Sequence, residues 1–228
     1  RTGKPVFDDI FMRLPVSIKV AFLGMLLATV MGLPLGVLSA VKQYSPADSF
    51  LRVASTVLVA MPTFWLAMLL ILVFALYLGW LPAGGALTWQ SYILPTITVG
   101  VPYGSKVLRM TRSTMLEEIR QDYVRTARSK GVPEKKVIYG HALKNALLPV
   151  ITTIGSAFGA ILGGSVIAES VFNLPGLGSL IVLSIKAKDT PSVLASVLLL
   201  AVFFALIMLI VDLVYAFIDP RIKAKYAK

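Results

Sequence analysis

The stretch from Asn145 to Ala168 reads NALLPVITTIGSAFGAILGGSVIA and contains no charged side chain. A helix rises about 1.5 Å per residue and the hydrocarbon core of a bilayer is about 30 Å thick, so roughly 20 such residues span a membrane. Two further stretches meet this condition, Val20–Val41 and Thr190–Val211. A fourth, Val53–Ser105, is long enough for two spans. The sequence therefore predicts five transmembrane helices.

The composition of the whole chain agrees with a lipid environment. Of its 228 residues, 57% are hydrophobic and the mean hydropathy is +0.83, whereas soluble domains are roughly 45 to 50% apolar. We expect an all-α, polytopic membrane protein with a single transmembrane domain over residues 1–228. The expected spans cover about residues 15–41, 53–78, 92–112, 145–168 and 190–218.

The amino-terminal stretch differs from the spans. Val6, Ile10 and Leu14 share one face of an amphipathic segment, which we expect to lie at the membrane interface before the first span. The chain starts with Arg1 and carries no signal-peptide pattern. We therefore expect a further segment upstream, with an additional span.

Positive charge is concentrated in one loop. The chain carries 22 Lys and Arg against 11 Asp and Glu, and ten of these basic residues, against four acids, lie between Lys106 and Lys144. The loop at residues 79–90 has no charge. Because basic loops stay in the cytoplasm, residues 113–144 and the C-terminus are predicted to be cytoplasmic and residues 169–189 external. The charge thus indicates topology and not nucleic-acid binding.

Within this loop, Met115–Lys130 has the pattern of a short amphipathic helix. One stripe of the helix would contain Leu116, Ile119, Tyr123 and Ala127. Gly131 suits the position that ends such a helix. On charge alone, the alternative is that the basic residues only fix topology and contact lipid headgroups.

The order of residues in the loop is more restrictive than its charge. Asp122 to Gly131 reads DYVRTARSKG, and His141 to Pro149 reads HALKNALLP. Both strings resemble the EAA loop of ABC importer permeases, in the variant found in B-type subunits of the dipeptide, oligopeptide and nickel permease family. The resemblance extends over nearly the whole chain and includes ESVFNLPGLG at Glu169–Gly178.

The chain departs from the broader EAA pattern at three positions. Arg125 stands in place of its leading Glu, Thr126 in place of its second residue Ala, and Lys144 in place of its Pro. Any pairing that the family assigns to that Glu therefore does not carry over to this chain.

The resemblance implies a type I ABC importer (MetI-like) arrangement with a cytoplasmic coupling helix, in the bacterial cytoplasmic (inner) membrane. It implies the transmembrane subunit of an ATP-driven importer, forming half of the pathway for small peptides or related cargo such as a nickel chelate or glutathione. The implied partners are a homologous permease subunit, two cytoplasmic ATPase subunits, an extracytoplasmic binding protein and the lipid bilayer. The residues implied to couple to the ATPase are Asp122, Tyr123, Arg125, Thr126, Ala127, Arg128, Lys130, Gly131 and His141.

No residue pattern in the chain supports catalysis. The phosphate-binding pattern G-x-x-x-x-G-K-[ST] is absent, and the nearest string, Gly100–Lys106, has three residues between its glycines. We therefore expect no cofactor in this chain, and ATP and Mg²⁺ on the partner ATPase subunits. The chain has no Cys and a single His, His141, which argues against a metal site or a histidine-based catalytic triad.

Two further groups are candidate functional residues. The first lies in the predicted external loop and contains Glu169, Phe172, Pro175, Gly176 and Gly178. The resemblance implies that this loop lines the outer mouth of the pathway or meets the binding protein, and a tight re-entry turn is the alternative. The second is Asp212 in the last span, a pathway residue or a structural pair or cap, because an acid at the centre of a span costs about 2.5 to 3.5 kcal/mol.

Proline and glycine add predictions about helix shape. Kinks are expected at Pro34, Pro62, Pro95, Pro102 and Pro149, and close helix packing at Gly155, Gly159, Gly163 and Gly164.

The alternative functions are an ion-coupled secondary transporter, which would need intramembrane ionisable residues, and a membrane scaffold or intramembrane enzyme.

Overall fold

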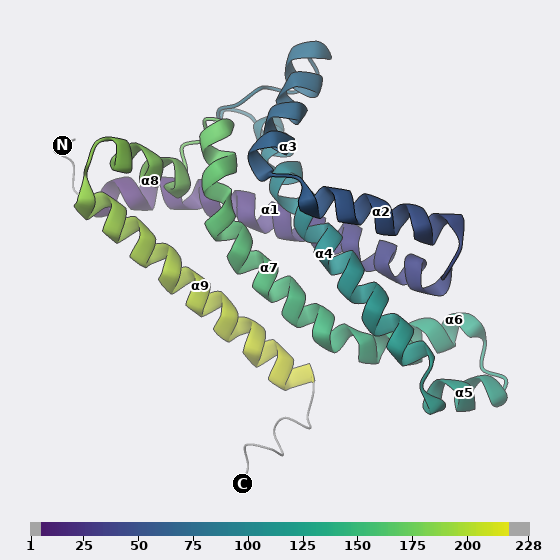
Figure 1. Cartoon of the computed structure of the whole chain (residues 1–228). Helices are drawn as coiled ribbons and strands as arrows, with labels where there is room; N and C mark the ends of the chain where they lie inside the picture. The colour runs from purple at the N-terminus through teal and green to yellow at the C-terminus, as the bar shows by residue number, and fades with distance from the viewer. Residues whose placement is uncertain (1–5, 219–228) are drawn as a thin grey trace, which may run out of the picture.

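The computed structural model describes the backbone of residues 6–218 and every side chain in that range except those of residues 212 and 214–218. Within this range all regular elements are helical, which confirms the predicted all-α fold (Figure 1). In chain order they are α1 (Val6–Val41), α2 (Pro46–Ala60), α3 (Thr63–Leu70), η1 (Ile71–Tyr77), η2 (Trp89–Tyr92), α4 (Ile93–Ile119), α5 (Asp122–Ser129), α6 (Glu134–Lys136), η3 (Val137–Ala142), α7 (Leu143–Val171), α8 (Leu177–Lys186) and α9 (Thr190–Ile218).

The first helix, α1, is longer than a bilayer core is thick. Its 36 residues extend over about 54 Å and continue through Pro15 and Pro34. The amino-terminal stretch is therefore the first part of this helix and not a separate segment. Its apolar face exists as predicted, but Ile10 and Leu14 are buried in a cluster with Leu177 of α8.

The helices α1 and α4 pack closely along a seam that contains glycines of both helices. A Cβ atom added at Gly32 would come within 2.5 Å of the carbonyl oxygen of Gly104, and one added at Gly36 within 2.5 Å of Thr111 Cβ. These positions leave no room for a side chain, so the two helix backbones approach as in other small-residue membrane interfaces. α7 packs against both helices and completes the core.

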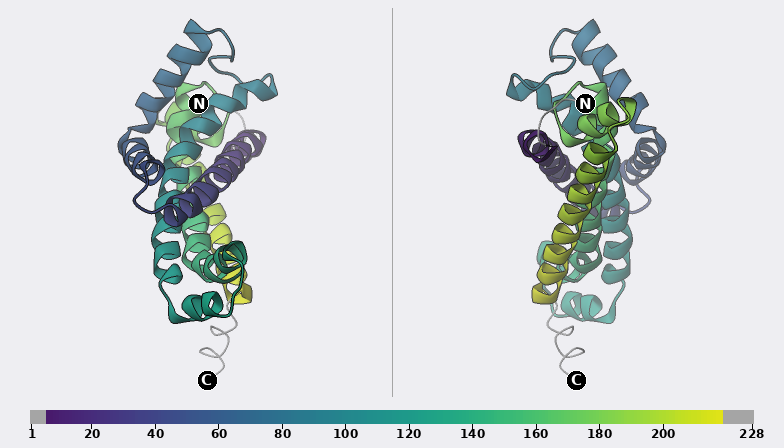
Figure 2. Two further views of the ribbon diagram at one scale, coloured as in Figure 1. Left: turned by 90° about the vertical axis from the view of Figure 1, so that its right-hand side faces the viewer. Right: turned by 90° about the vertical axis from the view of Figure 1, so that its left-hand side faces the viewer.

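The second predicted span is broken at Met61 and Pro62. α2 is bent by 104° relative to the segment formed by α3 and η1 (Figures 1 and 2). The break coincides with a proline, which has no N–H to continue the helix. By length and composition, three of the described helices can cross a membrane, or four if the bent pair is one span. α4, which covers the third predicted span, carries Lys106 and Arg109 and is not among them.

The glycines of α7 contact α9 at two of the four predicted positions. A Cβ atom at Gly155 would overlap Val211, and one at Gly159 would overlap the ring of Phe204. Gly163 has nothing within 4 Å of such an atom, and Gly164 has only the Tyr103 hydroxyl at 3.8 Å. Two of the four glycines predicted to allow close packing therefore contact α9 within this chain.

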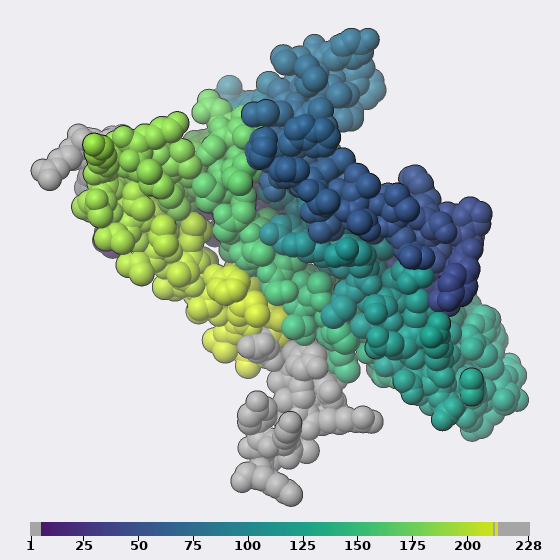
Figure 3. Space-filling view, viewed as in Figure 1, coloured from purple at the N-terminus to yellow at the C-terminus, as the bar shows by residue number. Residues whose placement is uncertain are grey.

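The two ends of the molecule are built differently. Figure 1 shows α5 and α6 at one end and α8 at the other. The predicted external loop, residues 169–189, is partly helical, because α7 continues to Val171 and α8 follows. In the space-filling view, α2, α7 and α9 share one face of the molecule (Figure 3).

Candidate coupling site

The segment Met115–Lys130 forms two helices, so the prediction of a single helix is wrong. α4 ends at Ile119, and Gln121 is extended, with φ −69° and ψ 151°, before α5 begins at Asp122. The break allows α5 to turn across the end of α4 (Figure 1). Asp122 in the first turn and Arg128 in the last turn both interact favourably with the helix dipole of α5.

Gly131 ends α5, as the sequence predicts. Its φ of +74° is left-handed, a conformation that glycine adopts without steric cost. The N–H of Gly131 donates to the carbonyl of Arg128 at 2.9 Å, and the N–H of Val132 donates to the carbonyl of Ala127 at 3.2 Å. This pair of hydrogen bonds is a Schellman motif, with Val132 and Ala127 as its apolar contact.

One face of α5 is buried in an apolar group that we name the coupling cluster. Val124 has no exposed surface and Ala127 is only 8% exposed. The cluster joins Val37 and Ala40 of α1, Met115 of α4, Val124 and Ala127 of α5, Val137, Ile138 and Ala142 of η3, and Ala146 of α7. α5 packs directly against η3, and the cluster continues from there to α1, α4 and α7.

The opposite face of α5 is exposed. The side chain of Asp122 is 98% exposed and that of Arg125 is 75% exposed, and their 3.9 Å contact is too open to hold either in place. The other predicted coupling residues with exposed surfaces are Tyr123, Thr126, Arg128, Lys130 and Gly131. Of the remaining two, Ala127 is buried in the coupling cluster and His141 is half-buried in η3.

Two polar contacts brace α5 from the sides. Arg128 donates from Nη2 to Glu134 Oε1 at 2.7 Å and from Nε to Glu134 Oε2 at 3.1 Å, and its guanidinium holds the pKa of that carboxyl below the usual value. The Tyr123 hydroxyl donates to Glu118 at the end of α4. Burial, followed by this contact with a carboxylate, raises the pKa of Tyr123. Sequence patterns predicted neither contact.

A buried ion pair near the end of the molecule that carries α5 was also not predicted from the sequence. Asp48 of α2 has no exposed surface, and Arg112 of α4 contacts it with Nε at 2.7 Å and Nη2 at 2.9 Å. Ser39 of α1 and the N–H of Tyr44 also donate to the carboxylate. The string Ser45-Pro46-Ala47-Asp48 indicates a helix start, and Asp48 N–H does bond Ser45 Oγ, but nothing in the string points to Arg112.

Glu169 is a second buried acid, at the opposite end of the molecule. It has no exposed surface, and its Oε2 accepts from the N–H groups of Gly178 and Ser179 at 2.7 and 3.2 Å. Ser165 donates to its Oε1, while Ser17 of α1 accepts from the N–H of Leu177. These contacts satisfy the first N–H groups of α8, so the carboxylate fixes α8 on α7.

The remaining candidate residues have mixed positions. Phe172, Gly176 and Gly178 are buried beside Glu169, and Pro175 is exposed. The side chain of Asp212 lies outside the described residues. Over the described part of the chain, no group of three or more His, Cys, Asp or Glu residues could hold a metal ion.

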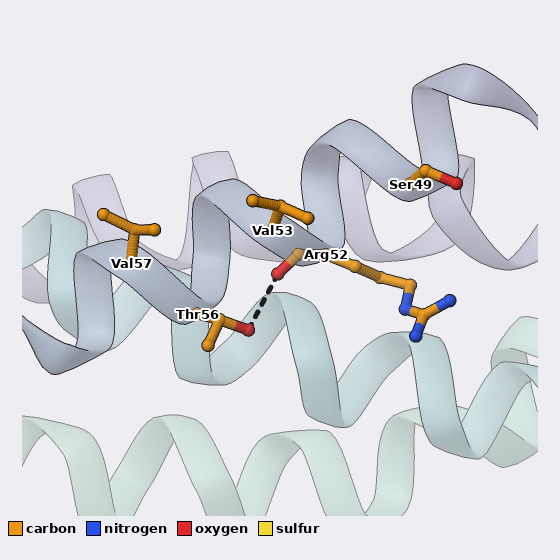
Figure 4. Close-up of a pocket in the computed structure, with 5 residues that line it drawn as sticks. All are labelled: Ser49, Arg52, Val53, Thr56 and Val57. Atoms are coloured by element: carbon orange, nitrogen blue, oxygen red, sulfur yellow. Dashed lines mark hydrogen bonds between the residues drawn. The ribbon is translucent and has the colours of Figure 1, made fainter.

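α2 carries an exposed strip that mixes polar and apolar side chains. A shallow groove along the helix is lined by Ser49, Arg52, Val53, Thr56 and Val57 (Figure 4). The Thr56 hydroxyl donates to the Arg52 carbonyl at 2.9 Å, while the guanidinium of Arg52 extends along the surface. A lipid-facing strip would be expected to lack such a charge.

Comparison with known proteins places this architecture. Residues 32–224 match the model of the family described as "Binding-protein-dependent transport system inner membrane component". The chain belongs to this family. It is a non-catalytic permease subunit of an ABC importer, which excludes the alternative of an ion-coupled secondary transporter and those of a scaffold or an intramembrane enzyme.

Individual relatives agree. The chain is 41% identical over 222 residues to the glutathione transport system permease protein GsiC of Escherichia coli strain K12, covering 97% of this chain and 72% of the relative. The figures are the same for GsiC of Salmonella paratyphi A. These relatives confirm the predicted branch of the permease family.

Solved structures show the same fold at lower identity. An inward-facing form of the MetNI methionine ABC transporter gives a TM-score of 0.78 at 18% identity, covering 96% of this chain and 100% of that chain. An amino acid ABC transporter solved with histidines gives 0.67 at 16% identity, covering 94% of each chain. The type I importer arrangement predicted for the chain is therefore confirmed.

Proposed function

We propose that α5 is the coupling helix, the element that the ATPase subunits contact and move in order to drive this permease. The observation that carries the proposal is the division of α5 into two faces. Its apolar face is locked into the coupling cluster, while Asp122, Arg125 and Thr126 project outward from the end of the molecule. A partner that binds the exposed face would move α5 together with α6, because the Schellman motif closes the C-terminal turn of α5 and the Arg128–Glu134 pair joins it to α6.

In this mechanism the chemistry takes place outside the chain. Two cytoplasmic ATPase subunits bind ATP and Mg²⁺, and their closure displaces α5. The coupling cluster passes the displacement to the ends of α1, α4 and α7. The bend between α2 and α3 and the seam between α1 and α4 then set which helices move together.

The cargo that we propose is glutathione or another short peptide. GsiC, at 41% identity, is named as a glutathione permease. An extracytoplasmic binding protein would deliver the cargo, as the family description indicates. A homologous permease subunit would form the other half of the pathway, and the exposed strip of α2, with Ser49, Arg52 and Thr56, is suited to a polar lining.

The test uses the complete reconstituted complex with its ATPase subunits and binding protein. The variant Arg125→Glu reverses an exposed charge on α5. It should lower glutathione uptake per ATP hydrolysed by about tenfold, because the introduced carboxylate would be repelled by an ATPase surface that is complementary to the positive charge of Arg125. The control is Lys135→Glu, also exposed on the same end but on α6. Equal uptake per ATP in Arg125→Glu and the unaltered complex would contradict the coupling role of α5.

A further inference from the structure

A groove lies between α1 and the start of α4, at the end of the molecule where α8 lies. It has a volume of about 540 Å³ and is lined by Lys19, Leu23, Leu27, Trp89, Tyr92, Ile93, Thr96 and Ile97. The position of this groove relative to α8 follows from Ser17, two residues before Lys19 in α1. Ser17 Oγ accepts a hydrogen bond of 2.8 Å from the N–H of Leu177, the first residue of α8. The groove therefore starts at the level of α8.

The groove has a charged end and an apolar length. Lys19 is exposed, and its Nζ lies 4.6 Å from the centre of the Tyr92 ring. Among the four ion pairs of the described residues, none involves Lys19. Leu23 and Leu27 follow one and two turns further along α1, about 6 and 12 Å deeper. They face Ile93 and Ile97 of α4 across the groove.

This order of groups matches an amphiphile and not a soluble cargo. A cation at the mouth, flanked by two aromatic side chains, Trp89 and Tyr92, is the arrangement expected at headgroup level in a membrane. Below it, an apolar channel parallel to the helices is suited to an acyl chain. Lys19 has an aromatic neighbour but no carboxylate partner among the described residues, and an anionic headgroup would neutralise its charge.

We propose that the α1–α4 groove binds an anionic phospholipid, with its phosphate at Lys19 and one acyl chain along Leu23 and Leu27. The bound lipid would cover the outer half of the seam between α1 and α4, where Gly24 and Gly100 bring the helices together. The site requires that the groove faces the lipid of the bilayer, and it does not depend on the cargo or on the role of α5.

The test measures lipids that remain on the complete complex. The complex is reconstituted in nanodiscs with equal amounts of phosphatidylglycerol and phosphatidylcholine, and the lipids that remain bound after extraction are counted by native mass spectrometry. The unaltered complex should retain phosphatidylglycerol in preference. Lys19→Ala should lower this preference about fivefold, the effect of one basic side chain at the membrane surface. Lys186→Ala, which removes an exposed lysine of α8 at the same end, is the matched control and should leave the preference unchanged.

A second variant tests the acyl channel separately. Leu23→Trp fills the groove while it keeps the cation, so it should reduce the total number of retained lipids. An unchanged preference in Lys19→Ala would overturn the headgroup assignment, and unchanged retention in Leu23→Trp would overturn the acyl channel. Displacement of retained phosphatidylglycerol by a dipeptide, dependent on Lys19, would replace the proposal with a cargo subsite.

Discussion

At each end of this permease, one buried carboxylate fixes how neighbouring helices pack. At the end that carries α5, Asp48 joins three helices, because its carboxylate accepts from Ser39 of α1 and Arg112 of α4 while it lies in α2. At the other end, Glu169 holds α8. Both carboxylates are fully buried and hydrogen-bonded, so each fixes the orientation of neighbouring elements.

We expect Asp48→Asn to destabilise the permease by about 3 kcal/mol, because it leaves the Arg112 guanidinium facing a neutral group in a buried site. The double variant Asp48→Asn with Arg112→Gln should recover part of this loss, since no unpaired charge remains. The measurement is the midpoint of thermal unfolding of the purified complex in detergent. If the losses of the two single variants simply add in the double variant, the two residues do not act as a pair.

At the scale of elements, α5 depends on its C-terminal turn. Gly131→Ala places a Cβ atom in open space, so its only cost is the left-handed backbone, about 1 kcal/mol. This cost should raise hydrogen exchange of the α5 amides about fivefold. Gly140→Ala is the matched control, because that glycine is helical and its Cβ would meet only Lys136 Cγ at 3.6 Å. Equal exchange in the two variants would show that the Schellman motif does not limit the opening of α5.

The seam between α1 and α4 offers a second comparison of glycines. A methyl group at Gly32 would meet the Gly104 backbone and Val107, so Gly32→Ala should separate the helices and cost about 1 to 3 kcal/mol. Gly163→Ala, in α7, has nothing within 4 Å and should be neutral or stabilising. Thermal unfolding of both variants checks this difference. A neutral Gly32→Ala would mean that the seam is looser than the structure shows.

The sequence predicted those features that depend on whether a segment lies in lipid or in water. A stretch without charge, such as Asn145–Ala168, can be recognised because lipid tolerates few alternatives, and α7 lies there. The left-handed turn at Gly131 was also predicted, since only its own residue type is required. The family resemblance implies the coupling residues from the strings Asp122–Gly131 and His141–Pro149, and their coupling role stays a prediction.

Features that depend on distant residues could not be predicted in this way. Arg112 and Asp48 are 64 residues apart, and they meet only because α2 and α4 pack together. The break at Gln121 was missed because the apolar stripe continues through it, while the coupling cluster requires α5 to change direction. The sequence placed Glu169 in the predicted external loop, but it did not predict the contacts of its carboxylate with the N–H groups of Gly178 and Ser179 in α8.

At the scale of the whole molecule, the orientation in the membrane follows from charge, and it is open to a direct test. α5 and α6 lie at one end and α8 at the other (Figure 1). Because positive residues are retained in the cytoplasm, we expect the end with α5 and α6 to be cytoplasmic and α8 to face outward. The 228 residues contain no Cys, so a single introduced thiol reports on one position.

We expect Lys186→Cys, on α8, to react with a membrane-impermeant maleimide in intact spheroplasts. Lys135→Cys, on α6, should react only after the membrane is opened or inverted. Both side chains belong to exposed residues, so a difference in labelling measures sidedness and not burial. The unaltered protein controls for labelling elsewhere. Labelling of Lys135→Cys from outside would reverse the topology, and α5 would then be out of reach of any cytoplasmic ATPase.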